Sequence, residues 1–256
     1  MHVPDAVRLM TALHGKGKEV GAMMDPLINF EFDALELARN YRKGVVLEFA
    51  PCLRDTVVEV GAGIGQFAGL ISACPGVRRV IAVEPDADFC ARHRERYPDH
   101  MVVQGIFSDL PADVKPATIV SINVLEHIDD DVRELESYCQ CLASQKGMLC
   151  LLVPARKELH APIDQMFGHF RRYERMELER KVKQAGFKIH KSFYFNGMGY
   201  LAWWFNFCFL KRRTFEPHKV ALYDRWMFPW VHWFEFHGCR PFLGQSLVVI
   251  ARAERS

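Results

Sequence analysis

Three glycines at the end of an apolar run are the first residues whose types and spacing indicate chemistry. The run Val57–Val60 is followed by Gly61, Gly63 and Gly65, spaced G-x-G-x-G. A strand that turns into a helix through glycines leaves bare backbone, which a ligand can approach closely. Nineteen residues after Gly65, a second apolar run ends at Glu84. An acid at the tip of a second strand can accept both hydroxyls of a ribose, so the two features predict a site for a nucleoside-bearing cofactor.

The glycine spacing indicates which cofactor to expect. The dinucleotide fingerprint is G-x-G-x-x-G, and its third glycine lets helix and strand pack around a pyrophosphate. Gln66 occupies the position of that glycine, and the third glycine comes one residue earlier. The segments VVEVGAGIGQF and VIAVEPD instead resemble the first two motifs of class I S-adenosylmethionine-dependent methyltransferases. The alternative interpretation of the glycines is a plain tight turn between strand and helix.

This resemblance implies S-adenosylmethionine as the cofactor. In that family the first motif cradles the methionine part of the cofactor, and the second motif binds its ribose. The residues of this chain that match the two motifs are Glu59, Gly61, Ala62, Gly63, Gly65, Glu84 and Pro85.

The segment Gln104–Pro111 (QGIFSDLP) extends the resemblance with one departure. Many of these enzymes carry an acid here that meets the adenine amino group, and Ile106 occupies its place in this chain. The resemblance therefore assigns adenine recognition to backbone amides near Phe107, or to Asp109 if the loop is shifted.

The segment Asn123–Ile128 (NVLEHI) resembles the fourth motif of many small-molecule methyltransferases, which adds Asn123 and Val124 to the expected cofactor site. Some methyltransferases bind Mg²⁺ at this point through an E-x-x-E-H element. Here Asn123 replaces the first acid and leaves Glu126 and His127. Because two adjacent ligands do not make an octahedral site without helpers, the sequence predicts no metal.

The segment Asp164–Tyr173 (DQMFGHFRRY) resembles the D-x-x-x-G-H-x-R-R-Y element of bacterial methyltransferases linked with polysaccharide, glycolipid and secondary-metabolite pathways. Its place after the fifth expected strand implies a position above the sulfonium of the cofactor. An alcohol or phenol acceptor loses a proton, and a histidine with a near-neutral pKa can take it. His127 and His169 are the candidate bases, and the alternative for His127 is a role in shaping the cofactor pocket.

Two adjacent arginines and two tyrosines are candidates for the acceptor site. Arg171 and Arg172 can clamp an anionic group such as a phosphate or carboxylate; the alternative is salt bridging at the start of a helix. Tyr41 and Tyr173 can line the site, and the alternative for both is core packing.

A fold that brings these residues to one edge is expected from the hydrophobic pattern. Strand-like runs alternate with helical patterns, which predicts a parallel sheet with helices on both faces and a ligand site at the carboxyl ends of the strands. The expected strands are Thr56–Val60, Arg79–Glu84, Met101–Gln104, Thr118–Asn123 and Met148–Val153. The resemblance to the methyltransferases adds Gly244–Arg252 as the closing strand. The expected helices are Ala34–Lys43, Gln66–Cys74, Ala87–Tyr97, Asp130–Ala143 and Met176–Ala185.

The resemblance specifies the fold class further, as an α/β protein with a doubly wound, seven-stranded, mostly parallel sheet of the Rossmann-like methyltransferase type. The expected division is an N-terminal arm (1–32), a methyltransferase domain (33–195 and 241–256) and an aromatic helical lid inserted at 196–240.

The lid is predicted from its composition. Eighteen of the 31 aromatic residues, including all five tryptophans, fall between Phe187 and Phe236. The apolar run 197–210 has fourteen residues, fewer than the roughly 20 that a helix needs to span a bilayer. Three interpretations remain open: an extra core over the sheet, a substrate pocket that includes Trp203, and a surface that dips into a membrane with Lys211–Arg213 at the phosphates. Trp203 and Trp204 point about 100° apart on a helix, so only one is expected to face a pocket.

Composition and charge narrow the class of protein. The chain has 256 residues and a formal net charge of +2, which gives no general attraction to nucleic acid. Its eight cysteines include no C-x-x-C pair, which is typical of a reducing compartment. The N-terminus lacks the layout of a signal peptide. The expectation is a cytoplasmic protein, with peripheral membrane contact and oligomeric state left open.

Together these features predict an S-adenosylmethionine-dependent methyltransferase that acts on a small or lipid-linked acceptor. O-methylation in secondary-metabolite, polysaccharide or glycolipid biosynthesis is the leading expectation. N- or C-methylation of a small molecule is one alternative, because this fold serves many acceptor atoms. The other is a cofactor-binding protein that has lost catalysis and serves as a partner in a membrane pathway.

Overall fold

The computed structural model describes residues 36–212, 214, 216–238 and 240–254. The predicted N-terminal arm (1–32) and the first residues of the predicted helix Ala34–Lys43 lie outside this part of the chain.

Within the described residues, seven strands form one sheet in the order β3-β2-β1-β4-β5-β7-β6. Neighbouring strands from β3 to β5 pair in parallel, and β7 pairs antiparallel with both β5 and β6. This arrangement confirms the predicted fold class. The strands are β1 (Asp55–Val60), β2 (Val77–Glu84), β3 (Met101–Gln104), β4 (Thr118–Ile122), β5 (Met148–Pro154), β6 (Phe187–Phe195) and β7 (Ser246–Ala253).

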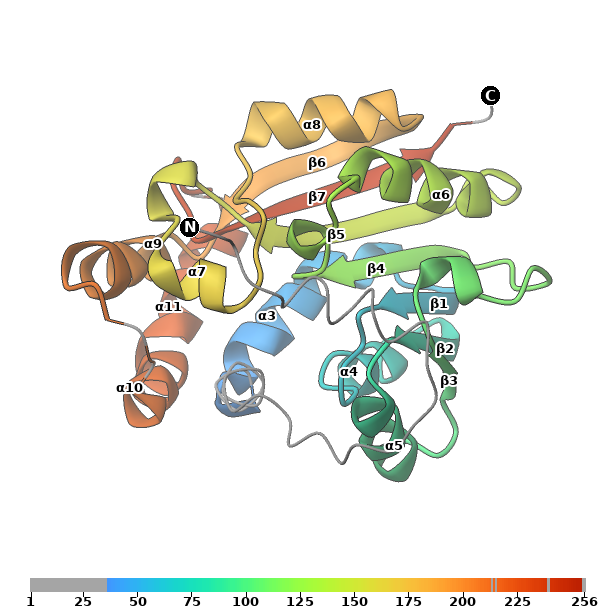
Figure 1. Cartoon of the computed structure of the whole chain (residues 1–256), viewed down its shortest axis with the longest axis horizontal. Coiled ribbons are helices and arrows are strands. Elements are labelled where there is room, and N and C mark those ends of the chain that lie inside the picture. The colour runs from blue at the N-terminus through green and yellow to red at the C-terminus, as the bar shows by residue number, and fades with distance from the viewer. Residues whose placement is uncertain (1–35, 213, 215, 239, 255–256) are drawn as a thin grey trace, which may run out of the picture.

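The sheet has an apolar layer on each face because its strands alternate with a period of two. In β4, Ile119 joins the core on the face covered by α6 (Asp131–Ala143) and α8 (Arg175–Gln184). Its neighbour Val120 joins the core on the opposite face. That second face is covered by α3 (Arg39–Phe49) and α4 (Ala68–Ser72). Figure 1 shows the sheet between these helices.

The remaining short elements lie in the connections of the sheet. They are α5 (Ala87–Arg96), α7 (Pro162–Met166) and the single-turn helices η1 (Ala50–Cys52), η2 (Phe107–Asp109), η3 (Leu125–His127) and η4 (Lys157–Leu159).

Two predicted helices differ from those found. The helix expected to end near Lys43 begins at Arg39 and continues to Phe49, because Val45, Val46 and Phe49 are buried in the core under the sheet. Gly44 does not break this helix: it lies where a Cβ atom would meet the ring of Phe228 at 3.0 Å. The helix expected at Gln66–Cys74 is shortened to Ala68–Ser72 because the preceding residues form the turn after β1.

The aromatic segment folds into helices beside the carboxyl ends of β4 and β5, on the left of Figure 1. It consists of α9 (Gly197–Trp203), the π-helical segment η5 (Trp204–Phe209), α10 (Pro217–Leu222), a second π-helical segment η6 (Tyr223–Met227) and α11 (Phe228–Phe236). We call residues 197–236 the lid. None of the described helices combines the length and apolarity needed to cross a membrane.

Buried acids fix the lid to the sheet domain. Asp224 accepts hydrogen bonds from the backbone amides of Asn40 and Tyr41 at 2.9 and 2.8 Å. Glu235 accepts them from Asn196 and Gly197 at 2.9 and 2.7 Å. Because buried carboxylates are costly unless they are hydrogen-bonded, these contacts hold the lid in a defined position against α3 and the end of β6.

Candidate active site

The loop after β1 has the backbone conformation that glycine permits. Gly61, Gly63 and Gly65 all have positive φ angles, of 68°, 51° and 82°. A Cβ atom at Gly61 would also collide with Val124, which comes from the turn after β4. The loop therefore leaves bare backbone at the carboxyl edge of the sheet, and Val124 lies directly against it.

Glu84 lies at the carboxyl end of β2, and two backbone amides hold its carboxylate. Gly63 donates to Oε2 at 2.7 Å, and Asp86 donates to Oε1 at 3.0 Å. Burial raises the pKa of this carboxyl to about 7, although the two amides act in the opposite direction. The glycine loop and the expected ribose acid are thus joined by a direct contact.

The side chain of Glu59 in β1, by contrast, is buried. Burial raises its pKa well above the usual range, and the nearby Glu84 adds to that effect. Its side chain is hydrogen-bonded to the backbone of Ala68 at the start of α4. Glu59 thus braces the turn between strand and helix, while Pro85 is exposed beside Glu84.

In the loop after β3, the acid Asp109 is hydrogen-bonded within the loop. Asp109 accepts a hydrogen bond from the backbone amide of Ile106 at 2.8 Å, which ties the loop to itself. Phe107 is buried, with its ring 4.6 Å from the ring of Tyr138 in an edge-on arrangement. The side chain of Ile106 is exposed.

A cavity of about 270 Å³ lies between the carboxyl ends of β4 and β5, α3 and the inner face of the lid. Five of the predicted site residues line it: Tyr41, Asn123, His169, Arg172 and Trp203. These residues come from four separate segments, because His169 and Arg172 share the connection between α7 and α8. The fold therefore gathers them at one place.

His169 is held by a buried acid. Its Nδ1 atom lies 3.0 Å from Oδ1 of Asp164, which also accepts from Nε of Arg172 at 2.8 Å. The other oxygen of Asp164 accepts from the backbone amide of Ala161 at 2.8 Å. Burial alone would raise the pKa of Asp164, but the hydrogen bond from His169 and the charge of Arg172 bring it below its usual value. Asp164 therefore stays ionised and orients the imidazole.

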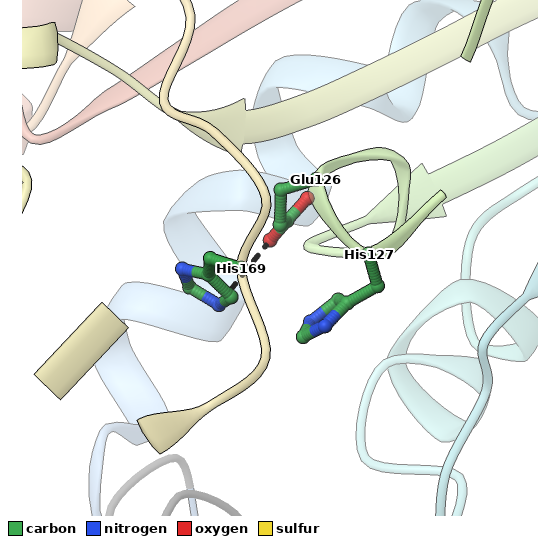
Figure 2. Close-up of side chains that lie close together, drawn as sticks. All are labelled: Glu126, His127 and His169. Carbon is green, nitrogen blue, oxygen red and sulfur yellow. Dashed lines mark ion pairs between the residues drawn. The ribbon is translucent and has the colours of Figure 1, made fainter. Parts of the chain in front are cut away.

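A second acid lies on the other side of the His169 ring. Nε2 of His169 is 3.9 Å from Oε1 of Glu126. Figure 2 marks this pair with a dashed line. Glu126 and His127 come from the turn after β4, and His169 comes from the chain that follows α7. One potential ligand atom from each of Glu126, His127 and His169 lies within 4.8 Å of the others. The three could hold a metal ion. His169 is distant in sequence from the Glu126-His127 pair, so the motif did not indicate it as a third ligand.

His127 does not line the cavity. Burial lowers its pKa to about 4, and the nearby His169 adds to the effect. Its ring lies edge-on to that of His169, with 4.8 Å between centroids. At neutral pH, a His127 ring with this pKa is uncharged and packs against His169. Among the two candidate histidines, the structure puts only His169 at the cavity.

Two predicted substrate residues are used elsewhere. Arg171 pairs with Asp131 at 2.9 Å and with Asp129 at 3.5 Å, which is the salt bridging considered as its alternative. Tyr173 is fully buried, and its hydroxyl donates to the Leu125 carbonyl or Asp131 carboxylate at 3.1 and 2.9 Å. Neither residue lines the cavity, because both brace the turn after β4 against the start of α6.

Arg172 and Trp203 form a stacked pair in the wall of the cavity. The guanidinium carbon of Arg172 lies 4.4 Å from the centre of the Trp203 ring. The indole of Trp203 donates to the carbonyl of Leu159 at 3.0 Å. Trp203 is 7% exposed and its neighbour Trp204 is 45% exposed, so the two point in different directions, as their spacing on a helix predicts.

Several polar residues of the cavity had no assigned role in the sequence. Asn196, Tyr223 and Ser246 line it. The hydroxyl of Tyr223 donates to Oδ1 of Asn196 at 2.6 Å, and the hydroxyl of Tyr41 lies 3.3 Å from that of Ser246. Burial raises the pKa of Tyr41 to about 12, so it is a neutral phenol. The sequence could have indicated a role for Asp164, because Asp164 is the first residue of the segment Asp164–Tyr173. No motif in the sequence indicates a role for Ser246.

The residues at the edge of the sheet fit S-adenosylmethionine. The glycine loop offers bare backbone next to an anchored carboxylate, which suits a ligand with a polar amino-acid part and a ribose. Gly61, Gly63 and Glu84 would hold it, with Val124 and Asn123 between the loop and the cavity.

Comparisons with known proteins agree with this geometry. A family model described as a methyltransferase domain matches residues 31–192. Two curated proteins from strains of Mycobacterium tuberculosis, each named "Probable S-adenosylmethionine-dependent methyltransferase", are 33% identical to the chain over 139 residues. The match covers 53% of this chain and 50% of each relative, so the chain spans about half the length of the curated relatives it matches.

Solved structures show the same fold at low sequence identity. One is a chain from the complex between the Haloferax volcanii Trm112 methyltransferase activator and a methyltransferase. It has a TM-score of 0.61 and 15% identity, covering 91% of this chain and all of that one. Another is an S-adenosylmethionine-dependent methyltransferase from Clostridium acetobutylicum, with a TM-score of 0.53 and 10% identity, covering 84% of this chain and 91% of that one.

Proposed function

The chain belongs to the family of methyltransferase domains and uses S-adenosylmethionine. From this premise we propose that it O-methylates a small or lipid-linked acceptor, which binds in the cavity under the lid. The observation that supports the proposal most directly is His169, which is held by Asp164 and lines a cavity whose wall also contains Asn123 from the cofactor edge.

The cofactor supplies a methyl group on a sulfonium that is already activated toward nucleophiles. The protein's task is therefore to orient the acceptor and to exclude water. Tyr41, Arg172 and Trp203 would shape the acceptor site, since they present a phenol, a cation and an aromatic wall to one cavity. Such a lining suits an acceptor with an apolar part and an oxygen that can be hydrogen-bonded.

His169 would take the proton from the acceptor hydroxyl. Its Nδ1–H donates to Asp164, which leaves Nε2 with the lone pair. An imidazolium formed at this ring would lie between the carboxylates of Asp164 and Glu126, which would stabilise the developing charge. His127 would support the ring of His169 from behind, and a metal ion is not required for this chemistry because the methyl donor needs no further activation.

Two alternatives are kept with the proposal. An amine or carbon nucleophile could occupy the same cavity, because cofactor motifs do not determine the acceptor atom. A partner protein without catalysis remains the alternative of another class. It is supported by Ile106 at the position of the adenine-binding acid and by the exposed aromatic side chains of the lid.

Calorimetry and a turnover assay test the proposal together. Binding of S-adenosylmethionine or S-adenosylhomocysteine by the full chain is expected, followed by release of S-adenosylhomocysteine when cell extract supplies the acceptor. Release with extract but not with buffer would exclude the inert partner, and binding without any turnover would favour it. Comparing metabolites of a deletion strain and its parent should then reveal the acceptor as a mass difference of one methylene.

A further inference from the structure

The lid has two faces of different character, and the outer face is exposed. Trp203 and Phe207 point inward to the cavity. Elsewhere on the described part of the lid, eight large aromatic side chains are each at least 40% exposed. We call them the outer aromatic face: Trp204, Phe205, Phe209, Trp226, Trp230, Trp233, Phe234 and Phe236. Several of these rings are neighbours: the centroids of Trp204 and Phe205 each lie 5.8 Å from that of Phe209, and those of Trp233 and Phe234 lie 5.0 Å apart. Exposed apolar groups that adjoin one another, unlike scattered ones, mark a surface that binds something.

The exposed residues follow one side of the helix formed by η6 and α11. Trp226, Trp230, Trp233 and Phe234 are spaced i, i+4, i+7 and i+8, which is one face of a helix. The buried residue Phe228 lies between them in sequence, and the buried Glu235 follows Phe234. Phe228 packs against α3 at Gly44, and Glu235 binds the amides after β6. Folding of the lid therefore fixes its inner side and leaves the tryptophans outside.

Charge on the lid is also divided between the two sides. The segment 197–238 contains three acidic residues and five Lys or Arg residues. Asp224 and Glu235 are buried on backbone amides, and Glu216 pairs with Arg212 and with Lys219 at 2.7 Å. Basic groups, in contrast, stay at the surface: Lys211 is exposed, and the guanidinium of Arg225 lies 5.3 Å from the centre of the Trp226 ring.

An apolar face rich in tryptophan and bordered by cations has the chemistry of a membrane-interface surface. Indole rings favour the headgroup level, where an apolar ring meets a polar layer, and Lys or Arg side chains are attracted to anionic lipids. We propose that the outer aromatic face docks on an anionic lipid bilayer, with Lys211 and Arg225 at the phosphates.

This docking would bring the cavity close to the membrane. The helices that carry the outer aromatic face also supply Trp203, Phe207 and Tyr223 to the cavity wall. An acceptor with a lipid tail could then reach the site without leaving the bilayer, a consequence that depends on the proposed function. The docking itself does not depend on methyl transfer, so each can be tested without the other.

Sedimentation with vesicles, in the absence of cofactor, tests the docking. The full chain is expected to sediment with phosphatidylcholine vesicles that contain about one third phosphatidylglycerol, and to do so much less with pure phosphatidylcholine or at high salt. The variant with Trp226→Ala, Trp230→Ala and Trp233→Ala should lower the vesicle partition coefficient at least about tenfold. Lys211→Glu with Arg225→Glu should abolish the preference for anionic lipid.

Controls separate docking from folding and from self-association. Met176→Ala removes a residue of α8 that is 85% exposed outside the lid, and it should leave vesicle binding unchanged. Calorimetry with S-adenosylhomocysteine should give the parent affinity for the triple tryptophan variant if it is folded. No sedimentation of the parent, or equal sedimentation of the triple variant, would overturn the proposal. A dimer in analytical ultracentrifugation that the triple variant loses, without vesicle binding by the parent, would instead assign the face to a second copy of the chain.

Discussion

Glu84 and His169 lie at the same edge of the sheet, yet the two regions around them are held by different kinds of contacts. Around Glu84, the binding groups are the backbone of the loop after β1 and a carboxylate anchored by Gly63 and Asp86. Around His169, the groups are side chains that hold one another, with Asp164 bound to His169 and Arg172, and Arg172 stacked on Trp203.

This difference indicates how each region can vary. Backbone groups in a glycine loop bind the part of a ligand that never changes, so the loop tolerates little substitution: Gly61 has no room for a Cβ atom. A site built from side chains on separate segments can be altered one residue at a time. We therefore expect acceptor specificity to change through the residues around His169, the proposed acceptor region, while the region around Glu84 stays the same.

Substituting His169 should have the largest effect. His169→Asn removes the proposed proton acceptor, and turnover with extract as the acceptor source should fall about 100-fold or more, with cofactor affinity unchanged. Asp164→Asn should lower turnover less and shift its pH profile, because it acts through the orientation of His169. His127→Asn is the comparison, and a larger loss in it than in His169→Asn would contradict the assignment of the base.

Removal of the Glu84 carboxylate should affect only the cofactor. Glu84→Ala deletes two charge-assisted hydrogen bonds to the ribose, so the Kd for S-adenosylhomocysteine should rise about 100-fold, as measured by calorimetry. Trp204→Ala provides a control, since that side chain is exposed and belongs to the lid. An unchanged Kd in Glu84→Ala would contradict the assignment of the ribose site.

The raised pKa of Glu84 predicts how cofactor binding depends on pH. Burial raises this pKa to about 7 in the cofactor-free protein, so the carboxyl is mostly protonated at pH 6 and mostly ionised at pH 8. If the ionised form binds the ribose, affinity should be about fivefold higher at pH 7 than at pH 6 and should level off above pH 8. Glu84→Gln should lack this step. If the parent instead bound the cofactor more tightly as the pH falls, the result would contradict this prediction.

The two tryptophans should differ in what they control. Trp203→Ala should raise KM for the acceptor about tenfold through loss of the aromatic wall and of the contact with Arg172. It should also lower Tm, because a buried indole is removed. Trp204→Ala should change neither KM nor Tm substantially, and should instead weaken vesicle binding. Equal loss of cofactor binding in both variants would place the two residues in the main core rather than in a separate lid.

Metal removal should have the smallest effect. Glu126, His127 and His169 lie close enough to bind a cation, but the proposed chemistry does not use one. Turnover after treatment with EDTA should therefore equal that of the untreated protein. Loss of turnover that is restored by one divalent ion would assign these three residues to a metal site, and would replace His169 as the base.

The contact between the glycine turn and Glu84 could be predicted from the sequence because each of the two features is local. A glycine turn and a strand-end acid are each contained in a few residues, and parallel pairing of β1 with β2 suffices to bring them together. Six of the seven strands also agree with their predicted bounds to within a few residues at each end, whereas β6 (Phe187–Phe195) was not among the strands predicted by residue. The extent of helix α3 was harder to predict, because Gly44 lies at a close contact with the lid that no local sequence pattern indicates.

The acceptor region was only partly predictable. The motif Asp164–Tyr173 indicated the right segment, but not which of its side chains face the cavity. His169 and Arg172 do, whereas Arg171 and Tyr173 turn to Asp131. Adjacent residues with the same chemistry differ here in orientation, and orientation is determined by which buried acid each one meets.

The sequence alone predicted parallel strands and a site for a nucleoside-bearing cofactor, because strand periodicity and a glycine turn act over a few neighbouring residues. The resemblance to the methyltransferases then specified seven strands and S-adenosylmethionine. Tertiary structure alone decided that His169 comes between Asp164 and Glu126, and that Ser246 joins the site beside Tyr41. It also decided that Trp203 faces the cavity while Trp204 stays outside. These outcomes depend on contacts between segments up to 205 positions apart, and the packing that selects such contacts exists only in the folded chain.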